Sequence, residues 1–124
     1  MGLLIDTNVL IWLHSGDPRV SKRAADRIAG GDDILFVSVV SAWEYGQKRL
    51  KYPDQLPVAF DLLVASLPHE RLDLPYAIHD YAESLPPLHT DPFDRMLIAQ
   101  ALHQDLELVA SDATIRRYPV RTLW

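Results

Sequence analysis

The 124-residue sequence contains no cysteine, which excludes a disulfide scaffold, a thiolate metal site and a cysteine nucleophile. It has no apolar run long enough to span a bilayer. The opening Met-Gly-Leu-Leu-Ile lacks the basic region and the cleavage site of a signal peptide. Internal repeats, low-complexity tracts and linkers are also missing. We therefore expect a single cytoplasmic domain over residues 1–124, with no membrane association.

Positive charge is scarce, because 12 Lys and Arg face 17 Asp and Glu, for a formal net charge of −5. This balance argues against a protein that holds nucleic acid mainly through a basic surface. If four acids form a cation site, the rest of the chain carries −5 + 4 = −1, and the objection disappears. What the chain does have is apolar material, 48% of all residues, which is enough for a core.

Short apolar runs alternate with longer helical stretches, which predicts βα units around a parallel sheet and an α/β fold class. Ser21 and Ser38 are suitable N-caps for two of the helices, and Pro92 suits the first turn of another. The expected strands are residues 3–5, 34–37, 71–74, 106–110 and 120–124, and the expected helices begin at residue 9 and cover 21–29, 38–50, 58–67, 75–84 and 92–103.

Four acids stand where such a fold forms its sites. Asp6 directly follows the first strand, Glu44 lies in the helix after the second strand, and Asp112 follows the fourth. The carboxyl ends of parallel strands meet at one edge of the sheet, so these three side chains are expected to converge there. Asp94 lies in the first turn of the 92–103 helix and joins them if that helix starts at the same edge.

Such a cluster needs a counter-charge. Two carboxylates ~4 Å apart repel by ~4 kcal/mol at an effective dielectric of ~20, so several together require protonation or a bound cation. No His-x-x-x-His or Cys-x-x-Cys spacing favours zinc. All-oxygen ligands favour Mg²⁺ or Mn²⁺, and an ion held this way activates water and stabilises charge on a phosphoryl group.

Each acid also has a purely structural interpretation. Asp91 suits the N-cap of the 92–103 helix, which places Asp94 in a first turn where the helix dipole favours negative charge. Asp6 suits an Asx-turn between strand and helix, and Asp112 suits the cap of a short segment after the fourth strand. Four such coincidences at one sheet edge are less ordinary than a shared site, which we therefore favour.

Several polar residues beside the acids are candidates for contact with substrate. These are Arg95, Asn8 and Arg116, with His89 as a weaker candidate close to the third acid. Lys48 lies four residues after Glu44, and an i,i+4 ion pair on the helix explains it without a role in binding.

Taken in order, four segments resemble the acidic motifs of PIN domains. They are Leu-Leu-Ile-Asp-Thr-Asn-Val-Leu-Ile at 3–11, Ser-Val-Val-Ser-Ala-Trp-Glu-Tyr-Gly-Gln-Lys at 38–48, His-Thr-Asp-Pro-Phe-Asp-Arg-Met-Leu-Ile-Ala-Gln-Ala at 89–101 and Leu-Val-Ala-Ser-Asp at 108–112. The resemblance extends over essentially the whole chain, and the VapC-type toxins are the subgroup that it matches best.

The resemblance implies a three-layer α/β/α sandwich with a central parallel sheet. It implies a Mg²⁺- or Mn²⁺-dependent endoribonuclease in which metal-activated water hydrolyses RNA phosphodiesters. It implies the toxin half of a toxin–antitoxin pair: a homodimer neutralised by a small antitoxin protein. Carried over by position, Asp6, Glu44, Asp94 and Asp112 are the catalytic, metal-binding acids, with Asp91 only a helix cap. One departure is Ala110, where the family often has Thr or Ser.

Two other functions fit parts of the pattern. Phosphatases of the haloacid dehalogenase type also carry an Asp after the first strand, but they normally need a second Asp two residues later, where this chain has Asn8. A PIN-like scaffold that binds RNA or protein without cleavage is the non-enzymatic alternative, and the complete set of four acids argues against it.

Overall fold

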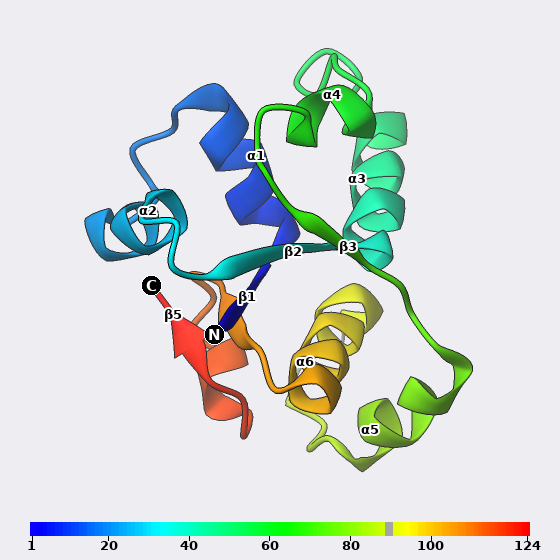
Figure 1. Cartoon of the computed structure of the whole chain (residues 1–124). Coiled ribbons are helices and arrows are strands. Elements are labelled where there is room, and N and C mark those ends of the chain that lie inside the picture. The colour runs from blue at the N-terminus through cyan, green and yellow to red at the C-terminus, as the bar shows by residue number, and fades with distance from the viewer. Residues whose placement is uncertain (89–90) are drawn as a thin grey trace.

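The computed structural model describes residues 1–88 and 91–124, which form five parallel strands with helices on both faces of the sheet (Figure 1). The strand order is β3-β2-β1-β4-β5. The strands are β1 (Gly2–Ile5), β2 (Ile34–Ser38), β3 (Glu70–Leu72), β4 (Glu107–Val109) and β5 (Thr122–Leu123). The helices are α1 (Thr7–Ser15), α2 (Lys22–Ala29), α3 (Val39–Lys51), α4 (Phe60–Val64), α5 (His79–Ser84) and α6 (Pro92–Gln104), with 3₁₀ turns η1 (Tyr76–Ile78) and η2 (Ile115–Arg117).

Two apolar cores make this a three-layer α/β/α sandwich. Alternate residues of β1 point to opposite faces, so Leu3 and Ile5 enter one core and Leu4 enters the other. The first core packs under α1, α2 and α4, and the second packs under α5, α6 and η2. Figure 1 shows α1, α2 and α4 on one side of the strands and α5 and α6 on the other. The expected fold class is confirmed.

The first two strands pass into their helices almost without connecting residues. The Asp6 N–H bonds to the Val109 carbonyl at 3.0 Å, which extends the β1–β4 pairing, while the Asp6 carbonyl accepts the Leu10 N–H at 3.0 Å. Ser38 is the last residue of β2 and the N-cap of α3, where its hydroxyl accepts the Val40 N–H at 2.9 Å. These junctions place the first turns of α1 and α3 at the carboxyl edge of the sheet.

The predicted elements are all present, with shifted bounds. Ser21, Ser38 and Asp91 cap their helices as expected. The helix expected over 58–67 is regular only over 60–64, and the one expected over 75–84 begins as the 3₁₀ turn η1 before α5. Pro75 fixes an extended backbone immediately before η1, so the chain enters this segment through a tight turn. Among the described residues, no helix is long and apolar enough to cross a membrane.

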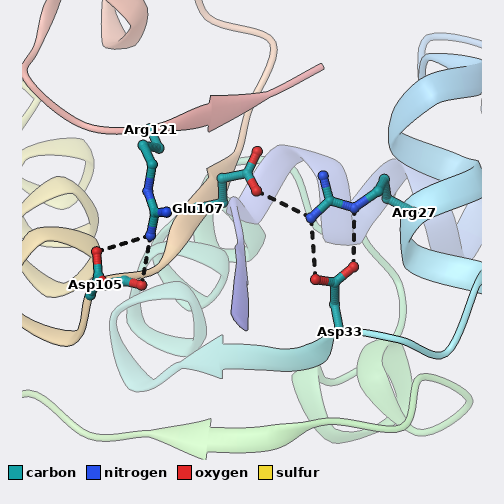
Figure 2. A network of polar contacts seen from close by, with 5 residues as sticks. All are labelled: Arg27, Asp33, Asp105, Glu107 and Arg121. Carbon is teal, nitrogen blue, oxygen red and sulfur yellow. Dashed lines mark hydrogen bonds and ion pairs between the residues drawn. The ribbon is translucent and has the colours of Figure 1, made fainter. Parts of the chain in front are cut away.

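At the opposite, amino edge of the sheet, arginines tie the strand starts together (Figure 2). The Arg27 guanidinium, from α2, donates to Asp33 ahead of β2 at 3.0 and 3.2 Å and to Glu107 in β4 at 3.1 Å. This pairing lowers the pKa of Asp33. Arg121 makes a second clamp on the side chain and carbonyl of Asp105, both at 2.9 Å. Two arginines thus offset three acids at this edge.

Candidate functional site

Buried acids gather at the carboxyl edge. Asp6 stands between β1 and α1 and is 6% exposed, Glu44 lies in the second turn of α3 and is 6% exposed, and Asp94 lies in the first turn of α6 and is 9% exposed. Their elements converge because β1 and β2 are neighbours and α3 packs against α6. The structure thus brings Asp6 and Glu44, two of the three acids expected to converge, together with Asp94, which was expected to join them if its helix started at this edge.

The third motif contributes a second acid that the sequence analysis treated only as a cap. One carboxylate oxygen from each of Glu44, Asp91 and Asp94 lies within 4.8 Å of the other two. Asp91 also accepts the Phe93 N–H at 2.9 Å, so its capping role is real. The Asp-x-x-Asp spacing at a helix N-terminus is the signal that could have found it, because N-cap and N3 side chains both lie at the helix entrance.

The acids perturb one another strongly. Burial, followed by repulsion from Asp94 and Glu44, raises the pKa of Asp6 from 3.8 to about 7. Lys48 and the Asn8 backbone act in the opposite direction but do not outweigh these effects. At neutral pH without a cation, Asp6 therefore carries only part of its charge. Buried like charges of this kind are typical of sites that bind an ion.

Glu44 has one carboxylate oxygen near a positive charge and one without a hydrogen-bond partner in the described part of the chain. Its Oε2 lies 3.7 Å from the Lys48 ammonium, whereas its buried Oε1 has no hydrogen-bond partner among the described residues. A buried unpaired carboxylate oxygen is costly, and an oxygen-seeking cation would satisfy it. The donors here are all carboxylate oxygens, the set that Mg²⁺ and Mn²⁺ prefer.

Lys48 does more than pair along its own helix. Its ammonium donates to the Asn8 side-chain oxygen at 2.7 Å, which links α3 to the first turn of α1. This long-range bond was missed because sequence spacing suggested only the i,i+4 pair with Glu44. Asn8, expected as a substrate contact, is therefore already engaged on one of its polar atoms, and Lys48 supplies the positive charge beside the acids.

The other predicted site residues are not part of the cluster of Glu44, Asp91 and Asp94. Asp112 follows β4 at the same edge but is exposed, and its Oδ1 accepts the Thr114 N–H at 2.7 Å, as expected of a cap. Arg116 is exposed in η2. His89 falls outside the described residues.

Arg95, expected as a substrate contact, forms hydrogen bonds within the chain. Its terminal nitrogens donate to the carbonyls of Pro86, Ala82 and Leu85 and to the Tyr118 hydroxyl, at 2.8–3.3 Å. These four bonds match the four hydrogens on the two terminal nitrogens. The guanidinium therefore anchors the α5–α6 connection and leaves no terminal N–H for a phosphate.

Buried polar side chains fix the elements that carry the acids, and none of these was predicted. The Thr7 hydroxyl donates to Ser41 at 2.9 Å, which joins α1 to α3. The fully buried Gln100 of α6 accepts from Ser38 at 2.6 Å and donates to the Asp73 carbonyl at 3.0 Å. Apolar periodicity alone cannot reveal such bonds, because each joins residues that are far apart in sequence.

Two hollows border the acids. One, of about 320 Å³, is lined by Glu44 with Gln47, Lys48, Lys51 and Phe93, and so combines positive charge with an aromatic ring. The other, of about 500 Å³, is largely apolar and passes between α3 and α6; it is lined by Val39, Val40, Trp43, Asp73, Leu74, Phe93 and Met96. Trp43 is 67% exposed there, and Leu50 further along α3 is 80% exposed.

The PIN domain family model matches residues 3–120, which is nearly the whole chain and includes all the acids described above. The chain is a PIN domain. A comparison with the sequences of curated proteins gave no match.

Solved structures share the fold of this PIN domain at low sequence identity. DNA-bound VapBC from Salmonella typhimurium has a TM-score of 0.70 at 18% identity, over 98% of this chain and 96% of that one. VapBC2 from Rickettsia felis, bound to a DNA fragment from its promoter, has a TM-score of 0.69 at 14% identity, over 100% of each chain. The PIN domain endonuclease Utp24 has a TM-score of 0.54 at 14% identity, over 94% of this chain and 74% of that one. One of the structures that share this fold, Utp24, is therefore that of an endonuclease.

Proposed function

We propose that this PIN domain is a divalent-metal-dependent endoribonuclease that hydrolyses RNA phosphodiester bonds. The observation that carries the proposal is the meeting of three buried acids, Asp6, Glu44 and Asp94, one of which, Glu44, has a buried carboxylate oxygen that lacks a hydrogen-bond partner among the described residues. Such a group is stable at neutral pH only with a cation or a proton. Its all-oxygen chemistry favours Mg²⁺ or Mn²⁺.

The chain's own residues define what the site does. Asp6 and Asp94 would be the principal ligands, and Glu44, whose carboxylate groups with that of Asp94, would add a further one. Asp112, at the same sheet edge, is the fourth acid by position. When bound, a divalent ion supplies the Lewis acid that activates water and stabilises charge on the phosphoryl group. The fixed first turns of α1, α3 and α6 keep these acids in position throughout.

The RNA path follows the charged hollow beside Glu44. Lys48 and Lys51 place positive charge next to the acids, and Phe93 offers a ring face on which a base can stack. Asn8 and Arg116 remain proposed contacts. Because the net charge of the chain is −5, attraction to RNA must come from this local arrangement and from bound cations.

The chain is further proposed to be the toxin of a toxin–antitoxin pair, acting in the cytoplasm as a homodimer. The likeness to VapBC structures supports this assignment. The apolar hollow at Trp43 and Met96, beside the acids, is a surface where a small antitoxin protein would also cover the site. Co-expression with the reading frame next to its gene should yield a stable complex, and light scattering of the free chain should give twice the monomer mass.

The decisive experiment is cleavage of a panel of structured and unstructured RNAs by the purified protein with Mg²⁺, with Mn²⁺ and with EDTA. Asp6→Asn and Asp94→Asn should each reduce cleavage at least a thousandfold, since each removes a ligand and leaves a similar shape. Asp17→Asn is the control, because Asp17 lies beyond the far end of α1.

Cleavage that persists in EDTA, or in either acid variant, contradicts the assignment. Release of phosphate from small esters with RNA left intact would point to the phosphatase alternative. Metal binding without cleavage, together with unaltered growth when the protein is expressed, would point to a binding scaffold.

A further inference from the structure

Asp91 has two structural features that bear on its role. It caps α6 through the Phe93 N–H at 2.9 Å, and it places a carboxylate oxygen within 4.8 Å of ligand oxygens from Glu44 and Asp94. The four-acid pattern does not include it. A carboxylate has two oxygens and about four lone-pair sites, so accepting one N–H does not exhaust its capacity to bind.

The spacing of the three carboxylates suits a small cation. Oxygens bound to one octahedral Mg²⁺ at ~2.1 Å lie about 3 Å apart when adjacent and about 4.2 Å apart when opposite. Separations of up to 4.8 Å therefore need only small side-chain rotations to enclose an ion. The first turn of α6 also contributes the positive end of a helix dipole, which helps two acids to remain close together.

An independent observation at Glu44 points to a ligand for this group. Glu44 is 94% buried, since 6% of its surface is exposed, and its Oε1 has no hydrogen-bond partner in the part of the chain that the structure describes. Lys48 approaches only the other oxygen, at 3.7 Å. The unpaired oxygen belongs to the same carboxylate that groups with Asp91 and Asp94.

We propose that Asp91 is a cation ligand, which together with Glu44 and Asp94 holds a divalent ion at the entrance of α6. The proposal rests on the proposed metal-dependent function and adds one ligand to it. It also explains why Asp, and not Ser, serves as this cap: either residue satisfies the Phe93 N–H, but only a carboxylate adds charge and a second oxygen to the site.

Asp91→Asn separates the two roles, because Asn is as good an N-cap as Asp but lacks the charge. The matched control is Asp17→Asn, since Asp17 likewise accepts the N–H two residues later, from Arg19, at 2.9 Å. Mn²⁺ binding to the full-length, metal-free proteins is measured by titration calorimetry, and thermal melting in EDTA reports on the cap.

We expect Asp91→Asn to melt within about 2 °C of the wild type and to bind Mn²⁺ at least tenfold more weakly, with Asp17→Asn unchanged in binding. Asp91→Ser, a second uncharged cap, should behave in the same way and replaces Asp91→Asn if that variant fails to fold. Wild-type affinity in the variant that folds overturns the proposal and leaves Asp91 as a cap alone. Absence of Mn²⁺ binding by the wild type overturns the metal-dependent function itself, and the wild-type titration identifies that outcome.

Discussion

Replacing Asp6 with Asn should make the metal-free protein more stable while abolishing the proposed nuclease activity. In the folded chain, burial and the neighbouring carboxylates raise the pKa of Asp6 from 3.8 to about 7. Between these values the folded state holds a proton that the unfolded state has released. The free energy of unfolding of the wild type therefore falls as the pH rises from about 4 to about 7.

The size of the effect follows from the two pKa values. The gap from 3.8 to about 7 corresponds to about 4 kcal/mol, at ~1.36 kcal/mol per pKa unit. Asn cannot ionise, so it removes this penalty, although a buried amide loses some hydration of its own. We expect a gain of about 2–4 kcal/mol at pH 7.5, which for a domain of this size raises Tm by about 6 °C or more.

The assay is thermal melting in EDTA at a series of pH values from 4.5 to 8, for wild type, Asp6→Asn and Asp112→Asn. The exposed Asp112 serves as the matched control at the same sheet edge. Tm should decline with pH in the wild type and in Asp112→Asn, and more gently in Asp6→Asn. Added Mn²⁺ should raise Tm only where Asp6 is retained. An Asp6→Asn protein that melts below the wild type at pH 7.5 would refute the electrostatic account.

Three further predictions test other contacts. Lys48→Met removes the hydrogen bond to Asn8 and a positive charge beside the acids. Calorimetry should show tighter Mn²⁺ binding, and melting in EDTA should show a free energy of unfolding that is lower by about 1 kcal/mol. Weaker Mn²⁺ binding would contradict the argument that Lys48 competes with the cation for the acids. Gln100→Leu removes the side chain that donates to the Asp73 carbonyl and accepts from the Ser38 hydroxyl. Urea denaturation should show a free energy of unfolding that is lower by about 2–3 kcal/mol, and an unchanged midpoint would contradict this. Arg27→Met should lower the urea midpoint at pH 7 while leaving the proposed RNA cleavage intact. Because Arg27 lowers the pKa of Asp33, the difference in midpoint should vanish as the pH falls below that lowered value.

Much of the fold could be predicted because its signals are local. The buried strand before Asp6 is a continuous apolar run, and the caps Ser21, Ser38 and Asp91 have side chains that satisfy N–H groups of the helices they precede. The ends of the helices were harder to predict, because the 3₁₀ turn before α5 depends on packing and not on composition. The order of the strands was not predicted, because it depends on pairing between segments that are far apart in sequence.

The site could be predicted only in part. Positions after strands indicated Asp6 and Glu44, because strand ends share an edge whatever the detailed packing. Which face a first-turn acid presents, and what it meets, depends on how α3 and α6 pack together. For that reason Asp91 was read as a cap alone, Arg95 as a substrate contact, and Lys48 as a partner of Glu44 alone.

The loopless junction at Asp6 has a consequence for how this protein can change. One residue ends the sheet hydrogen bonding to Val109 and begins α1 through Leu10, so an insertion there would rotate the acid away from its partners by about 100° per residue, given 3.6 residues per helical turn. Residues 30–33, which connect α2 to β2 at the other edge, do not position any of these acids, so an insertion there would not rotate one. Divergence in length should therefore accumulate at the amino edge of the sheet and not at the carboxyl edge.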